Sequence, residues 1–301
     1  MTSPRLVTAS HPGAASVFFL PMATGTLYIV ATPLGNLGDL SPRAAETLRT
    51  VDTVAAEDTR HTLGLLHSID AHPRLVSYHA HSNESRAAKL VELLLAGRDV
   101  AVVTDAGTPA ISDPGMDLVA LARDAGIRVV PIPGPSAVAT ALSAAGLVGD
   151  RYLFVGFLPR KGAARRRILE RMAGEPWSVV CFEAPGRLAD LMADLIPLCG
   201  PERQAVVARE LTKIHEEFRA GTLGELQAYY EDAAPLGEIT VVIAGRDGAM
   251  DDEAEVDTAA VLAAIGERLA AGDSRKDVVR MVTARFGLSR NDAYQLVTSQ
   301  P

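Results

Sequence analysis

Apolar residues recur along the chain in short runs that are separated by stretches with helical spacing. Runs typical of buried strands occupy residues 26–32, 51–57, 74–79, 99–105 and 127–132. Apolar positions spaced three and four residues apart predict amphipathic helices over 42–49, 60–67, 83–96 and 115–125. Near-continuous apolar strands that alternate with such helices predict an α/β sheet covered on both faces.

The alternation continues in the second half of the chain with a different rhythm. A helix is predicted over 137–146, and strands are predicted over 152–157, 178–183, 204–210 and 239–245, with fewer helices between them. We therefore expect two α/β domains, residues 25–134 and 135–246. An acidic linker at 247–256 then leads to a small helical module at 257–301. Its three short helices resemble a helix-turn-helix, and a bundle that binds no nucleic acid fits them equally well.

Composition removes several classes of protein. Hydrophobic residues make up 48% of the chain and charged residues 22%, as in soluble globular proteins. No apolar run approaches the roughly 20 residues that cross a bilayer, so no membrane association is predicted. Cys181 and Cys199 form no CxxC pair, which disfavours a disulfide scaffold and predicts a reducing cytoplasm. We expect residues 1–24 to lie outside the fold, either disordered or ahead of a start at Met22.

Familiar nucleotide and metal motifs are missing from the sequence. Neither GxGxxG nor GxxxxGK[ST] occurs, so a Rossmann dinucleotide site and a P-loop both lose their main support. Four histidines fall within 15 residues, but they match no metal-ligand template and no cysteine accompanies them. We therefore predict that the protein binds no metal.

Glycine and proline gather in the loops that follow the predicted strands. These loops are "ATPLGNLGDLSP" (31–42), "AAEDTRHT" (55–62), "TDAGTPAISDPG" (104–115) and "PIPGPSA" (131–137). In an open α/β sheet, ligands lie at this carboxyl end of the strands. Ser41 followed by Pro42 is sufficiently explained as the start of a helix. Gly35, Gly38 and Gly107 instead permit the backbone to approach a ligand closely.

Three strand ends carry an acid together with a base. The pairs are Asp58 with Arg60, Glu183 with Arg187, and Glu210 with Lys213. Such a pair can orient a substrate hydroxyl, and an ion-paired scaffold explains any single pair equally well. Their recurrence at three strand ends makes a shared role in one site more plausible than each pair does alone.

Basic residues concentrate in "PRKGAARRRILERM" (159–172), although the chain as a whole carries a net charge of −8. The run contains Arg160, Lys161, Arg165, Arg166 and Arg167. A solvated helix face is the usual meaning of such a run. Its concentration within an acidic chain instead predicts contact with phosphate groups. Few aromatic residues flank it, so stacking on unpaired bases is not predicted there.

The order of these motifs resembles a known family. "GTLYIVATPLGNLGDLSPRA", "AAEDTRHT", "TDAGTPAISDPG", "GIRVVPIPGPSA", "GFLPRKG" and "ARELTK" are similar to segments of the bacterial 2′-O-ribose methyltransferases of 16S ribosomal RNA, a branch of the tetrapyrrole methylase superfamily. The resemblance covers about residues 25–245 and, more weakly, the helical tail. One motif departs from the family pattern, because "FEAPGR" has Ala184 and Gly186 where a hydroxyl and an imidazole are common.

The resemblance implies an α/β fold of two tetrapyrrole-methylase-type domains with the active site in the cleft between them, and a homodimer. The implied cofactor is S-adenosylmethionine, and the implied substrate is the ribose of a decoding-centre cytidine in the 16S rRNA of the small ribosomal subunit. On this analogy the cofactor-binding residues are Pro33, Leu34, Gly35, Asp105, Ala106, Gly107, Ser112, Ser136 and Glu183.

Methyl transfer to a ribose hydroxyl needs alignment and a group that removes or orients the hydroxyl proton. We hypothesise Asp58 or Glu183 in that role, with Arg60, Arg187 or Lys213 binding phosphate or stabilising the developing alkoxide. Two other functions remain open at this point. One is a tetrapyrrole C-methyltransferase with the same fold and cofactor, and the other is a non-catalytic RNA-binding factor in ribosome assembly.

Overall fold

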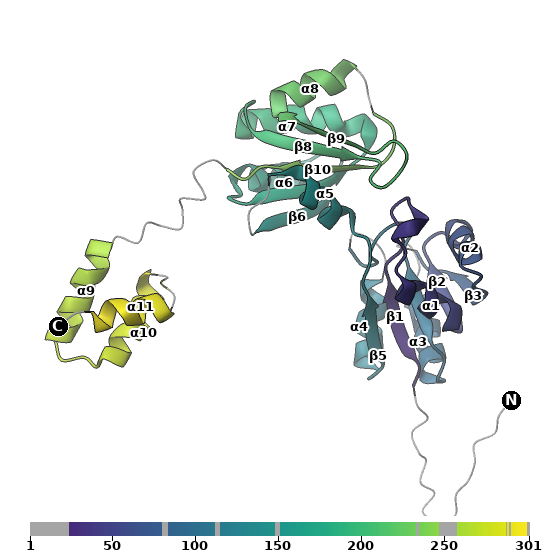
Figure 1. Ribbon diagram of the computed structural model, residues 1–301, viewed down its shortest axis with the longest axis horizontal. Helices are drawn as coiled ribbons and strands as arrows, with labels where there is room; N and C mark the ends of the chain where they lie inside the picture. The colour runs from purple at the N-terminus through teal and green to yellow at the C-terminus, as the bar shows by residue number, and fades with distance from the viewer. Residues whose placement is uncertain are drawn as a thin grey trace, which may run out of the picture.

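A computed structural model describes residues 24–79, 84–111, 115–147, 151–232, 235–246, 258–286, 288 and 290–299. Figure 1 shows the two sheets with their helices and the separate helical module. The predicted start near Met22 and the acidic linker at 247–256 lie outside the described residues. None of the helices that the structure describes has both the length and the apolar character needed to cross a bilayer.

The first sheet is parallel throughout, with the strand order β3-β2-β4-β1-β5. Its elements are β1 (Thr26–Val30), η1 (Leu37–Asp39), α1 (Pro42–Thr50), β2 (Thr53–Ala56), α2 (Thr59–Ser68), β3 (Arg74–Ser77), α3 (Glu84–Leu95), β4 (Val100–Val103), α4 (Met116–Asp124) and β5 (Arg128–Ile132). These bounds confirm the strands and helices predicted for this half within a few residues.

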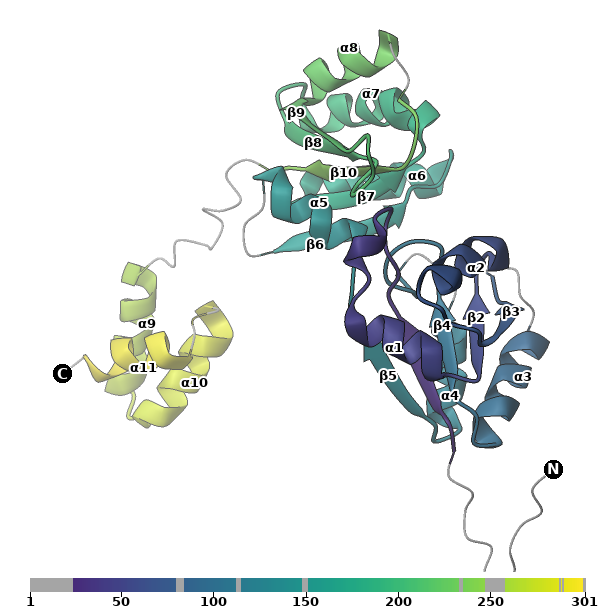
Figure 2. The ribbon, with the colours of Figure 1, turned by 45° about the vertical axis from the view of Figure 1, so that its right-hand side comes forward.

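Helices cover both faces of this sheet, as its continuous apolar strands predicted (Figure 2). Helices α1 and α2 pack on one face, and α3 and α4 pack on the other. The start of α1 is also confirmed, because the Ser41 hydroxyl accepts a hydrogen bond from the Ala44 amide at 3.1 Å and Pro42 is the first helical residue. Because the strands of this sheet are parallel, the carboxyl ends of β1, β2 and β4 all lie at the same edge.

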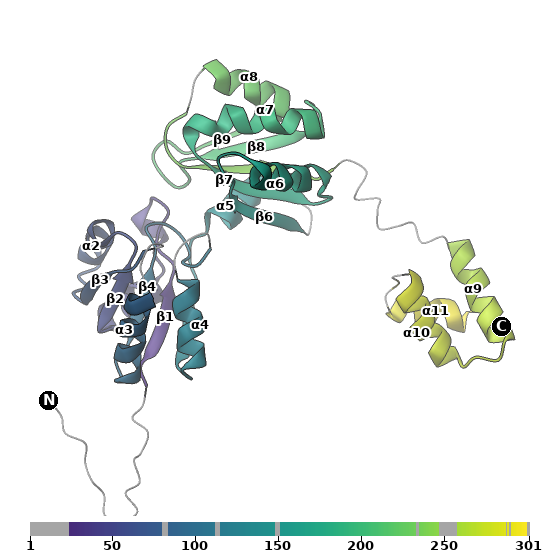
Figure 3. The ribbon, with the colours of Figure 1, turned by 180° about the vertical axis from the view of Figure 1, so that it is seen from behind.

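The second sheet is mixed, with the strand order β6-β7-β10-β8-β9; β6 and β7 are parallel and the other neighbours are antiparallel. Its elements are α5 (Ala137–Ala145), β6 (Tyr152–Phe157), α6 (Ala163–Gly174), β7 (Ser178–Glu183), η2 (Pro185–Arg187), α7 (Leu188–Cys199), β8 (Gln204–Arg209), β9 (Glu217–Thr222), α8 (Leu223–Asp232) and β10 (Ile239–Ile243). Helix α5 lies on one face, while α6, α7 and α8 lie on the other (Figure 3).

The prediction of fewer helices in this half was wrong. Helix α7 buries Leu188, Leu191 and Leu195 at helical spacing, but Pro197 in its last turn obscures the pattern. Strand β9 was missed because it is half-buried and contains both charged residues and glycine.

The three helices predicted at the C-terminal end are present as α9 (Thr258–Ala270), α10 (Arg275–Phe286) and α11 (Arg290–Thr298). They share a small apolar core that includes Val261, Ile265, Val278 and Val282. This core is separate from the cores of the two sheets, so the helices form their own packing unit.

Candidate active site

Two loops pair at the carboxyl edge of the first sheet. Thr32, after β1, and Gly107, after β4, form an isolated antiparallel bridge with N···O distances of 2.9 and 3.1 Å. The Thr32 hydroxyl also donates to the Thr104 carbonyl at 3.0 Å. Gly107 has φ +85°, a conformation that favours glycine, and this directs the backbone across the strand ends. The loops predicted to bind a ligand therefore hold each other in place.

A small hollow lies where this edge meets the second sheet. It is lined by Leu34, Ala106, Gly107, Thr108, Ile111, Ser136, Ala137, Val138 and Phe182. The first sheet supplies the loop residues, α5 supplies its N-terminal turn, and β7 supplies the aromatic ring. Apolar side chains dominate this lining, and backbone groups of the two loops edge it. Such a surface suits a ligand with both apolar and hydrogen-bonding parts.

Four of the residues that were predicted to bind cofactor come together in this hollow: Leu34, Ala106, Gly107 and Ser136. The hollow has a volume of about 40 Å³, well below the roughly 300–1,000 Å³ of typical small-molecule pockets. It therefore has room for only a small chemical group. Ser112 lies outside the described residues.

Asp105 supports the neighbouring loop and does not line the hollow. Its carboxylate accepts a hydrogen bond from the Asp58 amide at 3.0 Å. One residue earlier, at the same end of β4, the Thr104 hydroxyl donates to Glu57 at 2.8 Å. These two bonds link the ends of β2 and β4, so the acidic loop after β2 is held next to the hollow.

Asp58 caps helix α2 and pairs with Arg60. Its carboxylate accepts from the Arg60 amide at 2.8 Å and from the guanidinium at 2.7 and 3.1 Å. The side-chain hydrogen bond from Arg60, followed by the backbone one, holds the pKa of Asp58 well below its ordinary value. A carboxylate with so low a proton affinity is a weak general base, although it can still orient a hydroxyl group.

Lys213 lies at the contact between the two sheets and does not line the hollow. Its ammonium pairs with Glu210 at 2.9 Å and with Glu238 at 3.2 Å. Burial lowers the pKa of Lys213, but the hydrogen bond to Glu210 and the charge of Glu238 outweigh burial and raise it overall. A Cβ atom on Gly35 would lie 2.3 Å from the Lys213 Cγ. A larger residue at position 35 would collide with the aliphatic part of the Lys213 side chain, which explains why glycine fits there.

Phe182 and Glu183, the last two residues of strand β7, point to opposite faces of the second sheet. Successive side chains of a strand point to opposite faces, so Phe182 joins the core on the α5 side and Cys181 joins the core beneath α6 and α7. Glu183 accordingly faces α6 and α7, away from the hollow. Glu183, which was predicted to bind the cofactor, therefore does not line this hollow. Burial raises the pKa of the Cys181 thiol far above its ordinary value, so that thiol is inert.

The Glu183 carboxylate is fully buried and held by two guanidinium groups. One oxygen pairs with Arg187 and accepts from the Ala184 amide at 2.8 Å, while the other lies 3.5 Å from Arg165. Arg165 in turn pairs with Asp194 at 2.8 Å. Burial of a charge is stable only when it is compensated in this way. The network thus connects the end of β7 to both α6 and α7.

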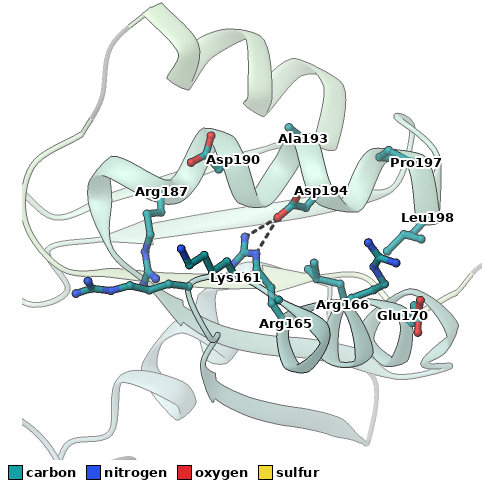
Figure 4. Close-up of a pocket in the computed structure, with 13 residues that line it drawn as sticks. Lys161, Arg165, Arg166, Glu170, Arg187, Asp190, Ala193, Asp194, Pro197 and Leu198 are labelled. Atoms are coloured by element: carbon teal, nitrogen blue, oxygen red, sulfur yellow. Dashed lines mark hydrogen bonds and ion pairs between the residues drawn. The ribbon is translucent and has the colours of Figure 1, made fainter.

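A wider groove of about 690 Å³ runs between α6 and α7 (Figure 4). Its polar lining consists of Arg160, Lys161, Arg165, Arg166, Glu170, Arg187, Asp190 and Asp194. Among the described residues, Arg160, Lys161 and Arg166 form no ion pair, so their charge is available to a ligand. The groove is therefore the place in the structure where most of the basic run of the sequence is exposed to a ligand.

Two arginines of that run are placed differently from Arg160, Lys161 and Arg166. Arg165 was expected to contact RNA with the others, but its side chain is only 8% exposed and is occupied by Asp194, Glu183 and the Pro159 carbonyl. It forms the floor of the groove. Arg167 is exposed but does not line the groove.

The sequence reasoning also missed an aromatic group beside the hollow. Phe182 packs between Phe154 and Phe157, with ring centroids 5.0 and 5.2 Å apart. Phe157 is 59% exposed, so an exposed aromatic ring does stand close to the basic run, where few aromatic residues were expected. The strand "SVVCFE" has no alternation of polar and apolar residues that could have assigned Phe182 to this face. In the described part of the chain no group of three or more His, Cys, Asp or Glu side chains could hold a metal ion.

Comparison with known proteins places the chain in a family. The family profile described as Tetrapyrrole (Corrin/Porphyrin) Methylases matches residues 26–227. A protein of Synechocystis named ribosomal RNA small subunit methyltransferase I is 44% identical over 272 residues, covering 90% of this chain and 97% of the relative. One of the same name from Micromonospora olivasterospora is 46% identical and covers 91% and 87% of the two chains.

A solved structure supports the fold independently. Uroporphyrin-III C-methyltransferase from Thermus thermophilus, complexed with S-adenosylhomocysteine, matches with a TM-score of 0.54 at 19% identity. The match covers 72% of this chain and 97% of that structure. The chain therefore belongs to the tetrapyrrole methylases and, within them, to the ribosomal RNA small subunit methyltransferase I family.

Proposed function

We propose that the protein transfers a methyl group from S-adenosylmethionine to the ribose 2′-oxygen of a decoding-centre cytidine in 16S ribosomal RNA. The observation that carries this proposal is the position of strand β7. Its end contributes Phe182 to the hollow and Glu183 to the floor of a cationic groove. The hollow that gathers four predicted cofactor-binding residues and the groove lined by cations thus meet at one strand end. The names of relatives at 44% and 46% identity agree with ribosomal RNA as the substrate.

The cofactor would be held by the hollow and the open edge beside it. When bound, S-adenosylmethionine would supply a methyl carbon that a ribose oxygen can attack, with the neutral thioether S-adenosylhomocysteine as the leaving group. Leu34, Ala106, Gly107 and Phe182 would enclose the small reacting end, since these side chains and the glycine backbone leave room for little else. Ser136 begins α5 without a side-chain capping bond, so its hydroxyl is available to the ligand. Exclusion of water and alignment are then the main contributions of this wall.

The Asp58–Arg60 pair would orient the ribose. It lies beside the hollow, because the Asp58 amide is bound to Asp105 and the next residue, Ala106, lines the hollow. Its low proton affinity suits accepting a hydrogen bond from the 2′-hydroxyl rather than storing its proton. Asp58→Asn preserves the helix cap and removes the charge, so methyl transfer should fall while cofactor affinity stays the same. Full activity of Asp58→Asn would refute this role.

The cations of the groove would bind RNA phosphates. Arg160, Lys161 and Arg166 line the groove and form no ion pair among the described residues. Arg167 is exposed on the same helix, α6, next to the groove. Neutralising the three groove residues should weaken RNA binding and flatten its salt dependence, because each phosphate contact releases counterions. Arg171→Gln, on the same helix but outside the groove, is the matched control.

The decisive experiment is labelled methyl transfer to small ribosomal subunits that lack the modification. The labelled linkage should then resist alkaline hydrolysis, because a 2′-O-methyl group removes the attacking hydroxyl. Transfer to a porphyrinoid in place of RNA would instead establish the tetrapyrrole C-methyltransferase function. RNA binding with no methyl transfer to either acceptor would indicate the non-catalytic function.

The same proposal includes a homodimer acting in the cytoplasm. Leu37, Ile214 and Leu236 are exposed by 58%, 93% and 81%. They belong to loops that contact one another, since Lys213 touches Gly35 and pairs with Glu238. An exposed apolar patch of this kind is typical of a contact between protein chains. Light scattering of the wild type and of Ile214→Glu tests the dimer, and a monomeric wild type would refute it.

A further inference from the structure

The groove contains a guanidinium nitrogen whose bonding is incomplete. Arg187 Nη1 is buried and has no hydrogen-bond partner within the described part of the chain. Its other terminal nitrogen, Nη2, pairs with Glu183. A buried donor without a partner costs free energy, so such an atom in a native structure calls for a ligand. Arg187 lines the groove, as do the unpaired Lys161 and Arg160.

Glu183 determines where this nitrogen lies. Its carboxylate is fully buried beneath the groove and pairs with Arg165 as well as Arg187. Because Arg165 is anchored by Asp194 and by the Pro159 carbonyl, the carboxylate is fixed on both sides. Arg187 is therefore held through one end of its planar fork, while Nη1 at the other end has no acceptor among the described residues and is reached by an anion once the atoms that cover it move.

We propose that Arg187 Nη1, with Lys161, forms a phosphodiester subsite for the RNA strand, and that Glu183 is its positioning residue and not the general base. This inference rests on the proposed function and specifies how the RNA backbone is held there. A phosphate group matches the site because it offers several acceptor oxygens to a fork of donors. The partial charge compensation by Glu183 leaves the site cationic through Lys161 and Arg160.

The test separates positioning from catalysis with unmodified small subunits as substrate and a single-stranded RNA oligonucleotide for binding. Glu183→Gln keeps the shape of the side chain, and Arg187→Lys keeps the charge while losing the fork. Both should raise KM for subunits several-fold and leave kcat within about twofold. In Arg187→Gln the slope of log Kd against log salt should fall by about 0.7, the value for one single-strand phosphate contact. Inorganic phosphate should compete with RNA less well in the same variant.

Several results would overturn the subsite. Glu183→Gln with unchanged KM and a hundredfold lower kcat would make Glu183 catalytic. Unchanged KM and salt slope in the Arg187 variants would show that no phosphate binds there. Circular dichroism first establishes that each variant is folded. If Glu183→Gln does not fold, Arg187→Lys decides the question, because the Arg187 side chain is 27% exposed and its substitution disturbs the core less. If the wild-type protein methylates no subunit, the proposed function itself is contradicted. That result is separate from the outcomes for the Glu183 and Arg187 variants, which test only the subsite.

A second inference comes from the exposed ring of Phe157. This residue follows a bulge in β6 and lies opposite Phe182 in the sheet, on the face of the hollow. The chain then continues through Leu158 and Pro159 to the cations at the mouth of the groove. We infer that an unpaired base of the RNA stacks on Phe157 while its backbone continues toward the groove. Stacking on an aromatic ring places a base without reading its identity.

The experiment uses RNA carrying 2-aminopurine at or beside the target position. Binding should change its fluorescence, and Phe157→Ala should abolish the change and weaken binding about 5- to 150-fold. Phe157→Trp should retain both. Tyr152→Ala is the matched control, since Tyr152 is 48% exposed at the opposite end of the same strand. Equal behaviour of Phe157→Ala and the wild type would refute this inference alone.

Discussion

Gly107 offers a direct test of the hollow as the cofactor site. An added Cβ would lie 3.2 Å from Leu34 Cδ2 and 3.6 Å from the Pro135 carbonyl oxygen, within a hollow of about 40 Å³. Gly107→Ala has two effects. The residue must keep φ +85°, which costs about 1–2 kcal/mol for a residue with a side chain. The methyl group also occupies space in a packed site, which typically costs about 1–3 kcal/mol.

The second effect should appear in cofactor binding and the first in stability. One to three kcal/mol corresponds to an increase in Kd of about 5- to 150-fold for S-adenosylmethionine or S-adenosylhomocysteine, measured by titration calorimetry. Gly126→Ala is the matched control, because Gly126 has φ +70° and no atom within 4 Å of the added Cβ. It should lose similar stability and bind the cofactor normally. Normal binding by Gly107→Ala, or equal loss in both variants, would refute the assignment of the hollow.

Three other predictions concern charge and capping. Arg165→Ala should destabilise the fold by about 3–5 kcal/mol, because the buried Glu183 loses a partner, whereas the exposed Arg167→Ala should change stability by less than about 0.5 kcal/mol; urea denaturation compares them. The pKa of Glu210 is lowered from 4.5, mainly by a lysine hydrogen bond, so its contribution to stability is present above that pH and lost below it. The Tm difference between wild type and Glu210→Gln should accordingly shrink as the pH falls through 4.5. Ser41→Ala should cost about 1 kcal/mol of stability in the same denaturation assay, through loss of the cap.

Much of the architecture followed from hydrophobic spacing, because buried strands and amphipathic helices leave strong periodic signals. The first α/β sheet, covered on both faces, and the C-terminal helices were predicted from such signals. Helix α6 shows what was overlooked. Arg165, Leu169 and Met172 share a helix face at spacings of four and three, and all three are buried. The same periodicity that identifies a helix thus predicts which arginine of the basic run turns inward.

The site was harder to predict because it depends on contacts between distant segments. The resemblance supplied Leu34, Ala106, Gly107 and Ser136, which meet in the hollow. It could not supply the face on which Glu183 lies. In a strand whose residues are apolar on both sides, no alternation of polar and apolar positions marks the two faces. Only the packing of helices against the sheet resolves that choice.

Strand β7 has a consequence for how such a protein can change over evolutionary time. Its last two residues point to opposite faces of one sheet, so in the function proposed above they belong to surfaces for two different ligands. Substitution can alter either surface separately. A one-residue insertion or deletion within the strand would exchange them, putting a carboxylate into the apolar hollow and a phenyl ring beneath the cations. The strand should therefore vary in composition among related proteins and stay constant in length. The number of residues in the strand, which decides the face that each side chain occupies, is then constrained as strictly as any single residue.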